Sequence, residues 1–401
     1  MIDTLLRDVS PAVMLVGCCF LVFAMASCSE QPEQAEAPLT PPANSNQALL
    51  NALEGHTETI ILGDSDGPQI VLTPEISARV LGAAIDGAND ENLMWVDETV
   101  LDGSIWDTDP MFWNFGGLRT WTAPEDLFFV NAEKDADSWF VPKSLDPAPF
   151  ETVSVSATEA SFKADMDLPA NIGKTYSITI ARTIKLLTEP PADSGKLSSA
   201  IEYMGLEKIH SLTNRSDLVI GEDLPYICLW SLLQINPAGT TMVPVKEGVD
   251  PKWAYREYFN PLGDRLSIAD NIISIKIDGK YRLKIGIRPE AAGEGLAYLR
   301  DNEDGTGILF IKEFPVDPEG IYVDKPWGKP SDYGDAIELY NDDGNMGGFT
   351  EIECHGPAQR LEKGASQSHT LTLHMFRGPL EELKAVASSV LGTDLSNAVY
   401  Y

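Results

Sequence analysis

The sequence predicts an all-β protein, built as a large antiparallel sandwich with one short helix near each end of the folded region. Short runs rich in β-branched and aromatic residues recur along the chain, for example at 176–187 and 281–287. Turn sequences such as Asp278-Gly279 separate neighbouring runs, as in β-hairpins. Helical patterns are confined to 46–55, with Asn46 as the expected N-cap, and to 379–391, with Pro379 in its first turn.

Length and composition are those of one large domain. The chain has 401 residues, of which 43% are hydrophobic, so it can bury a substantial core. No repeat and no Pro/Gly-rich linker divides the body. We therefore expect a single β-sandwich domain over residues 47–401.

The charge excludes one class of partner. The chain carries 61 acidic and 29 basic residues, a formal net charge of −32. Such a surface repels nucleic acid and anionic lipid, so we expect no nucleic-acid partner. The acidic residues are spread along the chain, which is typical of a solvated surface.

Residues 1–28 have the pattern of an export signal and are excluded from the fold. A nearly continuous apolar run, 11–26, is too short for a comfortable membrane span and ends in Met25-Ala26-Ser27-Cys28. This ending resembles a bacterial lipobox, in which Cys28 becomes the lipidated N-terminus. An ordinary signal peptide or a single anchor helix is the alternative.

Residues 29–46 are rich in Pro, Gln, Glu, Ala and Ser, and we expect a disordered tether there. Ser29 after the cysteine resembles the sorting pattern of outer-membrane lipoproteins. The expected location is therefore the bacterial cell envelope, anchored to the outer membrane and facing the periplasm or the cell surface.

Only two cysteines, Cys228 and Cys354, lie in the body of the chain. Both occur in apolar runs, which favours buried free thiols, although a single disulfide is possible in an oxidising compartment. There is no CxxC motif and no pair of histidines at metal-ligand spacing. We expect neither a metal site nor a cofactor.

Residues 114–125 form the most informative stretch. Gly116 and Gly117 allow backbone angles that a Cβ would forbid, and they permit another chain or a ligand to come close. In a strand, Arg119 and Trp121 point to the same face, and Glu125 follows just beyond. An indole can cover the C–H face of a sugar while charged groups bond its hydroxyls. The alternative is a buried Trp packed on the Arg stem, with Glu125 as the ion partner of the Arg.

A second polar pattern lies in residues 348–355. Alternation places Glu351, Glu353 and His355 on one strand face, where two carboxylates and an imidazole can perform acid–base chemistry. A solvent-facing polar edge would have the same pattern. Trp230, in a run that is apolar on both faces, is either a core residue or a ligand platform.

Three passages together resemble a bacterial lipoprotein family related to aldose 1-epimerases, the galactose mutarotase-like proteins. They are residues 115–125, with their Gly-Gly, Arg-x-Trp and Pro-Glu elements; residues 212–217, followed by Leu229-Trp230; and residues 350–357, followed by 361–365 and 368–370. The resemblance covers about residues 56–378. It implies a β-supersandwich whose concave face binds carbohydrate.

The resemblance also implies site residues. Glu353 matches the late-strand glutamate that is the general base of mutarotases. The matching position of their general acid, a histidine, falls near Trp230 and Ser231, where this chain has none, and His210 lies before the turn. A ring-opening reaction needs a proton donor as well as a base, so His355, Glu351 or Arg119 would have to substitute.

We therefore expect an exported, lipid-anchored protein that binds a saccharide or polyol. Arg119, Trp121, Glu125 and Trp230 are the expected binding residues. If the protein is an enzyme, it is an epimerase-like isomerase with Glu353 as base. The alternative is a non-catalytic surface glycan receptor or an envelope structural lipoprotein.

Overall fold

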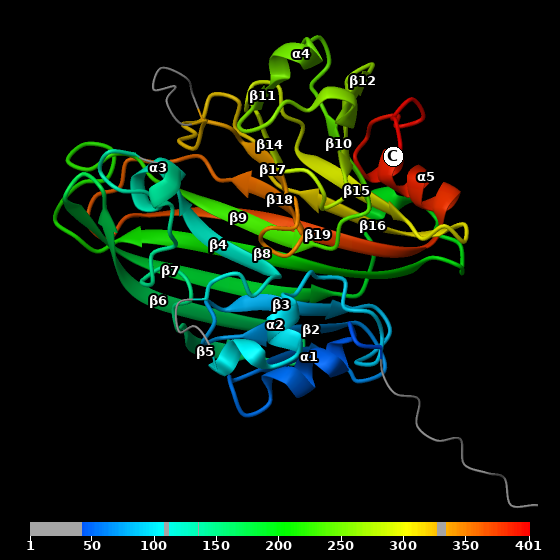
Figure 1. Cartoon of the computed structure of the whole chain (residues 1–401), viewed down its shortest axis with the longest axis horizontal. Coiled ribbons are helices and arrows are strands. Elements are labelled where there is room, and N and C mark those ends of the chain that lie inside the picture. The colour runs from blue at the N-terminus through cyan, green and yellow to red at the C-terminus, as the bar shows by residue number, and fades with distance from the viewer. Residues whose placement is uncertain (1–41, 108–111, 135, 327–333) are drawn as a thin grey trace, which may run out of the picture. The chain divides into compact units, whose positions relative to one another are not determined.

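The computed structural model describes residues 42–107, 112–134, 136–326 and 334–401 (Figure 1). The predicted signal segment with Cys28, and the predicted tether as far as residue 41, lie outside these ranges. Within them, no helix has the length and apolar character needed to cross a bilayer.

Two antiparallel sheets form the described structure, which confirms the predicted all-β sandwich. The nine-stranded sheet contains, in spatial order, β1 (Ile60–Gly63), β2 (Gln69–Thr73), β3 (Arg79–Ala84), β4 (Leu118–Ala123), β9 (Cys228–Ile235), β18 (Thr350–His355), β17 (Ile337–Asn341), β14 (Leu283–Ile287) and β11 (Tyr255–Glu257). The ten-stranded sheet contains β12 (Leu266–Ala269), β13 (Ile272–Ile277), β10 (Gly239–Pro244), β15 (Gly295–Asp301), β16 (Thr306–Glu313), β19 (Ser366–Pro379), β8 (Glu202–Asn214), β7 (Lys174–Leu187), β6 (Glu159–Ala170) and β5 (Glu151–Val155).

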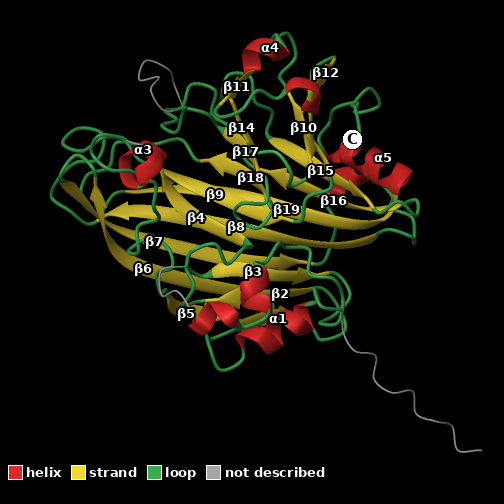
Figure 2. Cartoon of the chain, in the orientation of Figure 1, coloured by secondary structure: helices red, strands yellow, loops and turns green. Residues whose placement is uncertain are grey.

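Helices are few, and the first and last of those described pack against faces of the sheets (Figure 2). The described α-helices are α1 (Asn46–Leu53), α2 (Glu98–Leu101), α3 (Glu125–Phe128), α4 (Pro251–Ala254) and α5 (Leu380–Val390). The two predicted helices are therefore present. The N-cap of α1 is Ser45 rather than Asn46: the Ser45 side chain accepts a hydrogen bond from the N–H of Ala48, while Asn46 is the first helical residue and is fully buried.

Alternation along β4 decides which residues face the second sheet and which face away from it. Thr120 points between the sheets, where its hydroxyl lies 3.0 Å from Nδ1 of His210 on β8. Arg119 and Trp121, on either side of Thr120, therefore point to the opposite face of the nine-stranded sheet. The same rule applies to β9, where Ser231 accepts a hydrogen bond from Lys208 of β8 while Trp230 faces away.

The two glycines before β4 have the close backbone contacts predicted from the sequence. Gly116 and Gly117 have φ values of +105° and +71°. A Cβ on Gly117 would lie 2.1 Å from the carbonyl oxygen of Val80, and one on Gly116 would lie 2.1 Å from that of Trp95. Glycine is required here because the strand enters the sheet against neighbouring backbone.

The first prediction concerns Gly117. We expect Gly117→Ala to lower the free energy of unfolding by clearly more than the roughly 1–2 kcal/mol that an L-residue costs in the left-handed region, because the added methyl group also overlaps a carbonyl. The matched control is Gly173→Ala, which has a φ of +72° with nothing within 4 Å of the added Cβ. Chemical denaturation measures both. Equal losses in the two variants would show that the close approach at Gly117 contributes nothing.

Candidate functional site

The outward face of the nine-stranded sheet carries a cavity of about 380 Å³. Strands β4, β9, β14, β17 and β18 contribute its floor, and the loops beyond them contribute its walls. The lining residues are Trp113, Arg119, Trp121, Glu125, Asp137, Trp139, Trp230, Leu232, Tyr258, Phe259, Arg282, Lys284, Tyr340, Met346, Phe349 and Glu351. The cavity therefore combines four indoles with both acidic and basic side chains.

Strand register explains why these residues meet. Trp121 on β4 is opposite Trp230 on β9, which is opposite His355 on β18. In the neighbouring row, Arg119 is opposite Leu232, and Leu232 is opposite Glu353. Directly opposed residues on one face lie within side-chain contact, so segments far apart in the sequence form one continuous surface.

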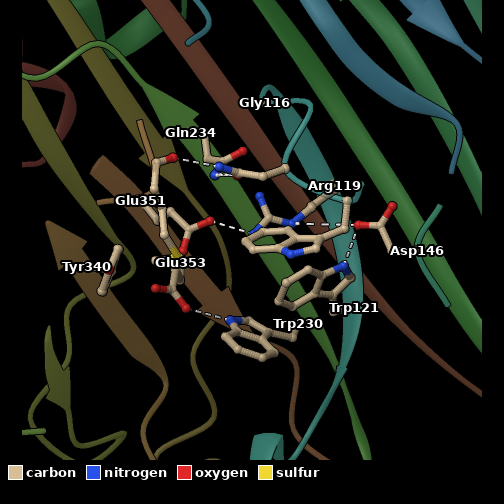
Figure 3. A network of polar contacts seen from close by, with 12 residues as sticks. Gly116, Arg119, Trp121, Asp146, Trp230, Gln234, Tyr340, Glu351 and Glu353 are labelled. Atoms are coloured by element: carbon tan, nitrogen blue, oxygen red, sulfur yellow. Dashed lines mark hydrogen bonds and ion pairs between the residues drawn. The ribbon is translucent and has the colours of Figure 1, made fainter. Parts of the chain in front are cut away.

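The buried carboxylate of Asp146 lies beside Arg119 and Trp121 and contacts both (Figure 3). The indole N–H of Trp121 donates to Oδ2 of Asp146 over 2.7 Å, and Nε of Arg119 lies 4.0 Å from the same oxygen. The Arg119 guanidinium lies over the Trp121 ring, 4.2 Å from its centroid. A planar cation stacked on an indole in this way is fixed in one orientation.

Asp146 also fixes the loop that leads into β4. It accepts a hydrogen bond from Arg79, whose guanidinium donates to the carbonyl oxygens of Gly116 and Trp113 over 2.7 and 2.6 Å. Arg79 is fully buried. One ion pair thus contacts the backbone at Trp113 and Gly116 and, through Asp146, the Arg119–Trp121 stack.

Three carboxylates line the cavity, those of Glu125, Asp137 and Glu351. Glu351 accepts a hydrogen bond from Nη2 of Arg119 over 2.6 Å, so Glu351 and not Glu125 is the close ion partner of this arginine. Glu125, at the start of α3, accepts a hydrogen bond from the indole N–H of Trp139 over 2.8 Å. Burial raises the pKa of Glu125, although Lys284 and the Trp139 hydrogen bond oppose the rise.

Glu353 and His355 lie behind the cavity wall rather than in it. Both are buried, and neither contributes to the lining. The indole N–H of Trp230 donates to Oε2 of Glu353 over 2.7 Å (Figure 3). The His355 ring stacks on the Trp230 ring, with 5.4 Å between the ring centroids. Trp230 therefore covers two of the three residues that the sequence predicted as catalytic, whereas the third, Glu351, lines the cavity.

Lys284 connects the cavity to this second layer. Its ammonium lies 2.7 Å from Glu338 and 3.4 Å from Glu353, and it sits 4.8 Å above the Trp230 ring. Burial acts to lower the pKa of Lys284, but Glu338 and Glu353 outweigh it and hold the pKa well above its usual range. For Glu338, burial acts to raise the pKa, but Lys284 and His355 hold it well below its usual range.

The pKa of Glu353 is shifted the other way. Burial raises it well above the usual range, and the nearby Glu338 and Glu351 carboxylates add to the rise although Lys284 opposes it. The pKa values of Glu338 and Glu353 are thus shifted in opposite directions, because Lys284 lies closer to Glu338.

Five of the seven predicted site residues meet in one cavity: Arg119, Trp121, Glu125, Trp230 and Glu351. The hypothesis of a solvent-facing polar edge at 351–355 is wrong, because β18 lies inside the sheet and every residue in it is buried. The core alternative for Trp121 holds in part, since this indole is only 2% exposed while lining the cavity.

Sequence reasoning missed the contributions of β14 and β17. Lys284 lies on the first and Arg282 just before it, and Glu338 and Tyr340 share a face of the second. In each of these two strands, the only signal in the sequence was one charged residue within an apolar run.

His210 lies between the sheets with Nε2 3.2 Å from Nδ1 of His369, away from the cavity. Cys228 and Cys354 are both buried free thiols.

The second prediction concerns Asp146. We expect Asp146→Asn to lower the free energy of unfolding by about 3–5 kcal/mol, because removing one partner of a buried ion pair leaves the Arg79 charge uncompensated. Asp217→Asn is the control, since its ion pair with Lys363 is solvent-exposed and should be worth at most about 1 kcal/mol. Urea denaturation compares the two. A loss at Asp146 no larger than that at Asp217 would contradict the proposed role of this carboxylate.

Comparison with known proteins found similar solved structures and one matching family model. The chain is similar to the crystal structure of a galactose mutarotase-like protein from Lactobacillus casei, with 11% identity, 79% of this chain and 100% of that chain covered, and a TM-score of 0.46. It is also similar to a galactose mutarotase related enzyme from Lactobacillus acidophilus, with 11% identity, 79% and 96% covered, and a TM-score of 0.40. No curated protein matches the chain. The family model DUF6786, described as a family of unknown function, matches residues 44–399, and the chain belongs to this family.

Proposed function

We propose that this protein binds a saccharide in the cavity on the outward face of the nine-stranded sheet. The observation that carries the proposal is the meeting of four indoles with fixed charged groups around one space of about 380 Å³. That volume lies within the roughly 300–1,000 Å³ typical of small-molecule sites. Indole faces cover the C–H surfaces of a sugar ring, and charge-assisted hydrogen bonds recognise its hydroxyls.

The indoles fall into two groups with different roles. Trp121 and Trp230 are each 2% exposed and form a rigid floor. Trp113 and Trp139 are partly exposed, and their ring centroids lie 5.3 Å apart. Trp139 is oriented by its hydrogen bond to Glu125. We assign the stacking contact with the ligand to Trp113 and Trp139, in place of the Trp121 contact expected from the sequence.

The geometry favours binding over isomerisation. Mutarotation needs a base at the anomeric hydroxyl and a proton donor at the ring oxygen. Glu353, the base that the resemblance implies, is 0% exposed and absent from the cavity lining. Glu351, which does line the cavity, is already bonded to Arg119. We therefore propose a receptor for a saccharide that does not convert its ligand.

The location remains part of the proposal. The lipobox-like sequence ending at Cys28 would attach the protein to the outer membrane, and residues 29–41 would separate the binding domain from the bilayer. A tethered domain of this kind can capture saccharides at the cell envelope.

The third prediction concerns ligand binding. A thermal-shift screen of monosaccharides and oligosaccharides identifies the ligand, and calorimetric titration then measures its affinity. We expect Trp139→Ala to weaken binding by about 1–3 kcal/mol, roughly 5- to 150-fold, because it removes an aromatic surface and frees Glu125. The control is Trp253→Ala, an indole that is 49% exposed on α4 and outside the cavity lining.

Two outcomes would contradict this proposal. Equal affinities in wild type, Trp139→Ala and Trp253→Ala would place the ligand elsewhere. Accelerated exchange between the anomers of the bound sugar, measured by saturation-transfer NMR, would make the protein an isomerase. If no saccharide binds, the alternative of an envelope structural protein is favoured.

The fourth prediction concerns the anchor. In a bacterial host with a lipoprotein pathway, we expect wild-type protein in the membrane fraction and Cys28→Ala either released from it or left unprocessed. Cys228→Ala, which removes a buried thiol of the body, is the control and should fractionate like wild type. Identical processing and fractionation of Cys28→Ala and wild type would refute lipidation at this residue.

A further inference from the structure

Behind the cavity wall, three potential metal ligands from separate segments converge. They are Asp324 in the loop before β17, Glu338 on β17 and His355 on β18, and all three are at most 1% exposed. One ligand atom from each lies within 4.8 Å of the other two. Nε2 of His355 lies 3.4 Å from Oε2 of Glu338. Two ligands at about 2.1 Å from a tetrahedral zinc ion lie roughly 3.4 Å apart, so this spacing needs little adjustment.

In each of these side chains, the polar atom that is not part of the cluster, here called the outer atom, contacts another group. Oδ1 of Asp324 accepts a hydrogen bond from the backbone N–H of Glu125 over 2.5 Å, and Oε1 of Glu338 accepts one from the Tyr258 hydroxyl over 2.6 Å. Nδ1 of His355 lies 3.8 Å from the sulfur of Cys228. Contacts of this kind, on the atom that does not bind, orient the ligands of protein metal sites.

The inner atoms, which form the cluster, have no hydrogen-bond partner of this kind. Oδ2 of Asp324, Oε2 of Glu338 and Nε2 of His355 are buried and make no hydrogen bond of ordinary geometry. Buried polar atoms are normally hydrogen-bonded, so three buried atoms without a hydrogen bond, all within 4.8 Å of one another, need an explanation. Oε2 of Glu338 has one further neighbour, the Lys284 ammonium at 2.7 Å.

The excess of acidic groups in the cluster also favours binding of a cation. Asp324, Glu338 and Glu353 are three buried carboxyl groups, and Lys284 is the one ammonium paired with them among the described residues. With all three carboxyl groups ionised, the cluster has a net charge of −2. Buried charge has to be compensated. A divalent cation supplies that compensation, and protons on the carboxyl groups are the alternative.

We propose that Asp324, Glu338 and His355 bind one divalent first-row transition cation, with zinc as the reference ion. An imidazole nitrogen combined with two carboxylate oxygens suits such cations, whereas calcium and magnesium prefer oxygen ligands throughout. The ion would lie behind Trp230, joining the loop at Asp324 to strands β17 and β18. This site is separate from the saccharide cavity and does not depend on the proposed function.

The fifth prediction tests this site on the full folded chain. After dialysis against a chelator, calorimetric titration with zinc chloride should show one saturable site, and calcium chloride should show none. Asp324→Asn and His355→Gln should each weaken zinc binding by at least about 100-fold, more than the roughly 10- to 100-fold typical of losing an outer-shell partner. Cobalt(II) added in place of zinc should give visible absorption bands in wild type that are absent from both variants.

Glu351→Gln is the matched control, because it removes a carboxylate from the same face of β18 without touching the three ligands. Its zinc affinity should equal that of wild type. Melting temperatures without metal distinguish a lost site from a lost fold. Asp324→Asn should melt no lower than metal-free wild type, since it removes one of the crowded carboxylates, while zinc should raise the melting temperature of wild type only. Absence of saturable zinc binding in wild type, or unchanged binding in Asp324→Asn, would overturn the proposal and leave shared protons as the occupants of the cluster.

Discussion

The cavity depends on one buried carboxylate. Asp146 accepts hydrogen bonds from Arg79, Trp121 and Ser77, and it lies 4.0 Å from Arg119. Arg182 lies in the same buried region, where burial lowers its pKa to about 9 and Asp146 opposes the fall. These cations are removed from water together, so the position of the carboxylate determines where they can lie. The floor of the cavity is therefore rigid before any ligand arrives.

Apart from its edge strands β1 and β11, the nine-stranded sheet is buried on both faces, and its two faces differ in chemistry. Apolar side chains and a few bonded polar groups pack between the sheets, where Lys208 and Lys312 donate to carbonyl oxygens of Arg119, Ser231 and Ile352. The outward face has ion pairs under aromatic rings instead. Because side chains alternate along each strand, one stretch such as 118–123 serves both faces at once.

Polar groups on the outward face are arranged in layers. Arg119 and Glu351 line the cavity, Trp230 covers Glu353 and His355, and Lys284 contacts both layers. A ligand that enters the cavity meets residues already bonded to one another, so little ordering is needed on binding. Glu353 and His355 are shielded from it by Trp230, so the residues that resemble a catalytic pair are poorly placed to reach a sugar.

The sequence by itself determined the fold class, the two longer helices, the glycine entry to β4 and the faces of β4 and β18. These features depend on local periodicity and on turn residues, which can be read from neighbouring positions. It also identified five of the residues that line the cavity.

Only the tertiary structure decided which carboxylate pairs with Arg119, because Glu351 lies 232 residues away in the chain and Glu125 only six. Only the tertiary structure likewise places Asp146 against Trp121 and Lys284 between Glu338 and Glu353. It also brings Asp324, Glu338 and His355 together. Strand order and register set these contacts. They depend on how distant strands pair across the sheet, which no local pattern records.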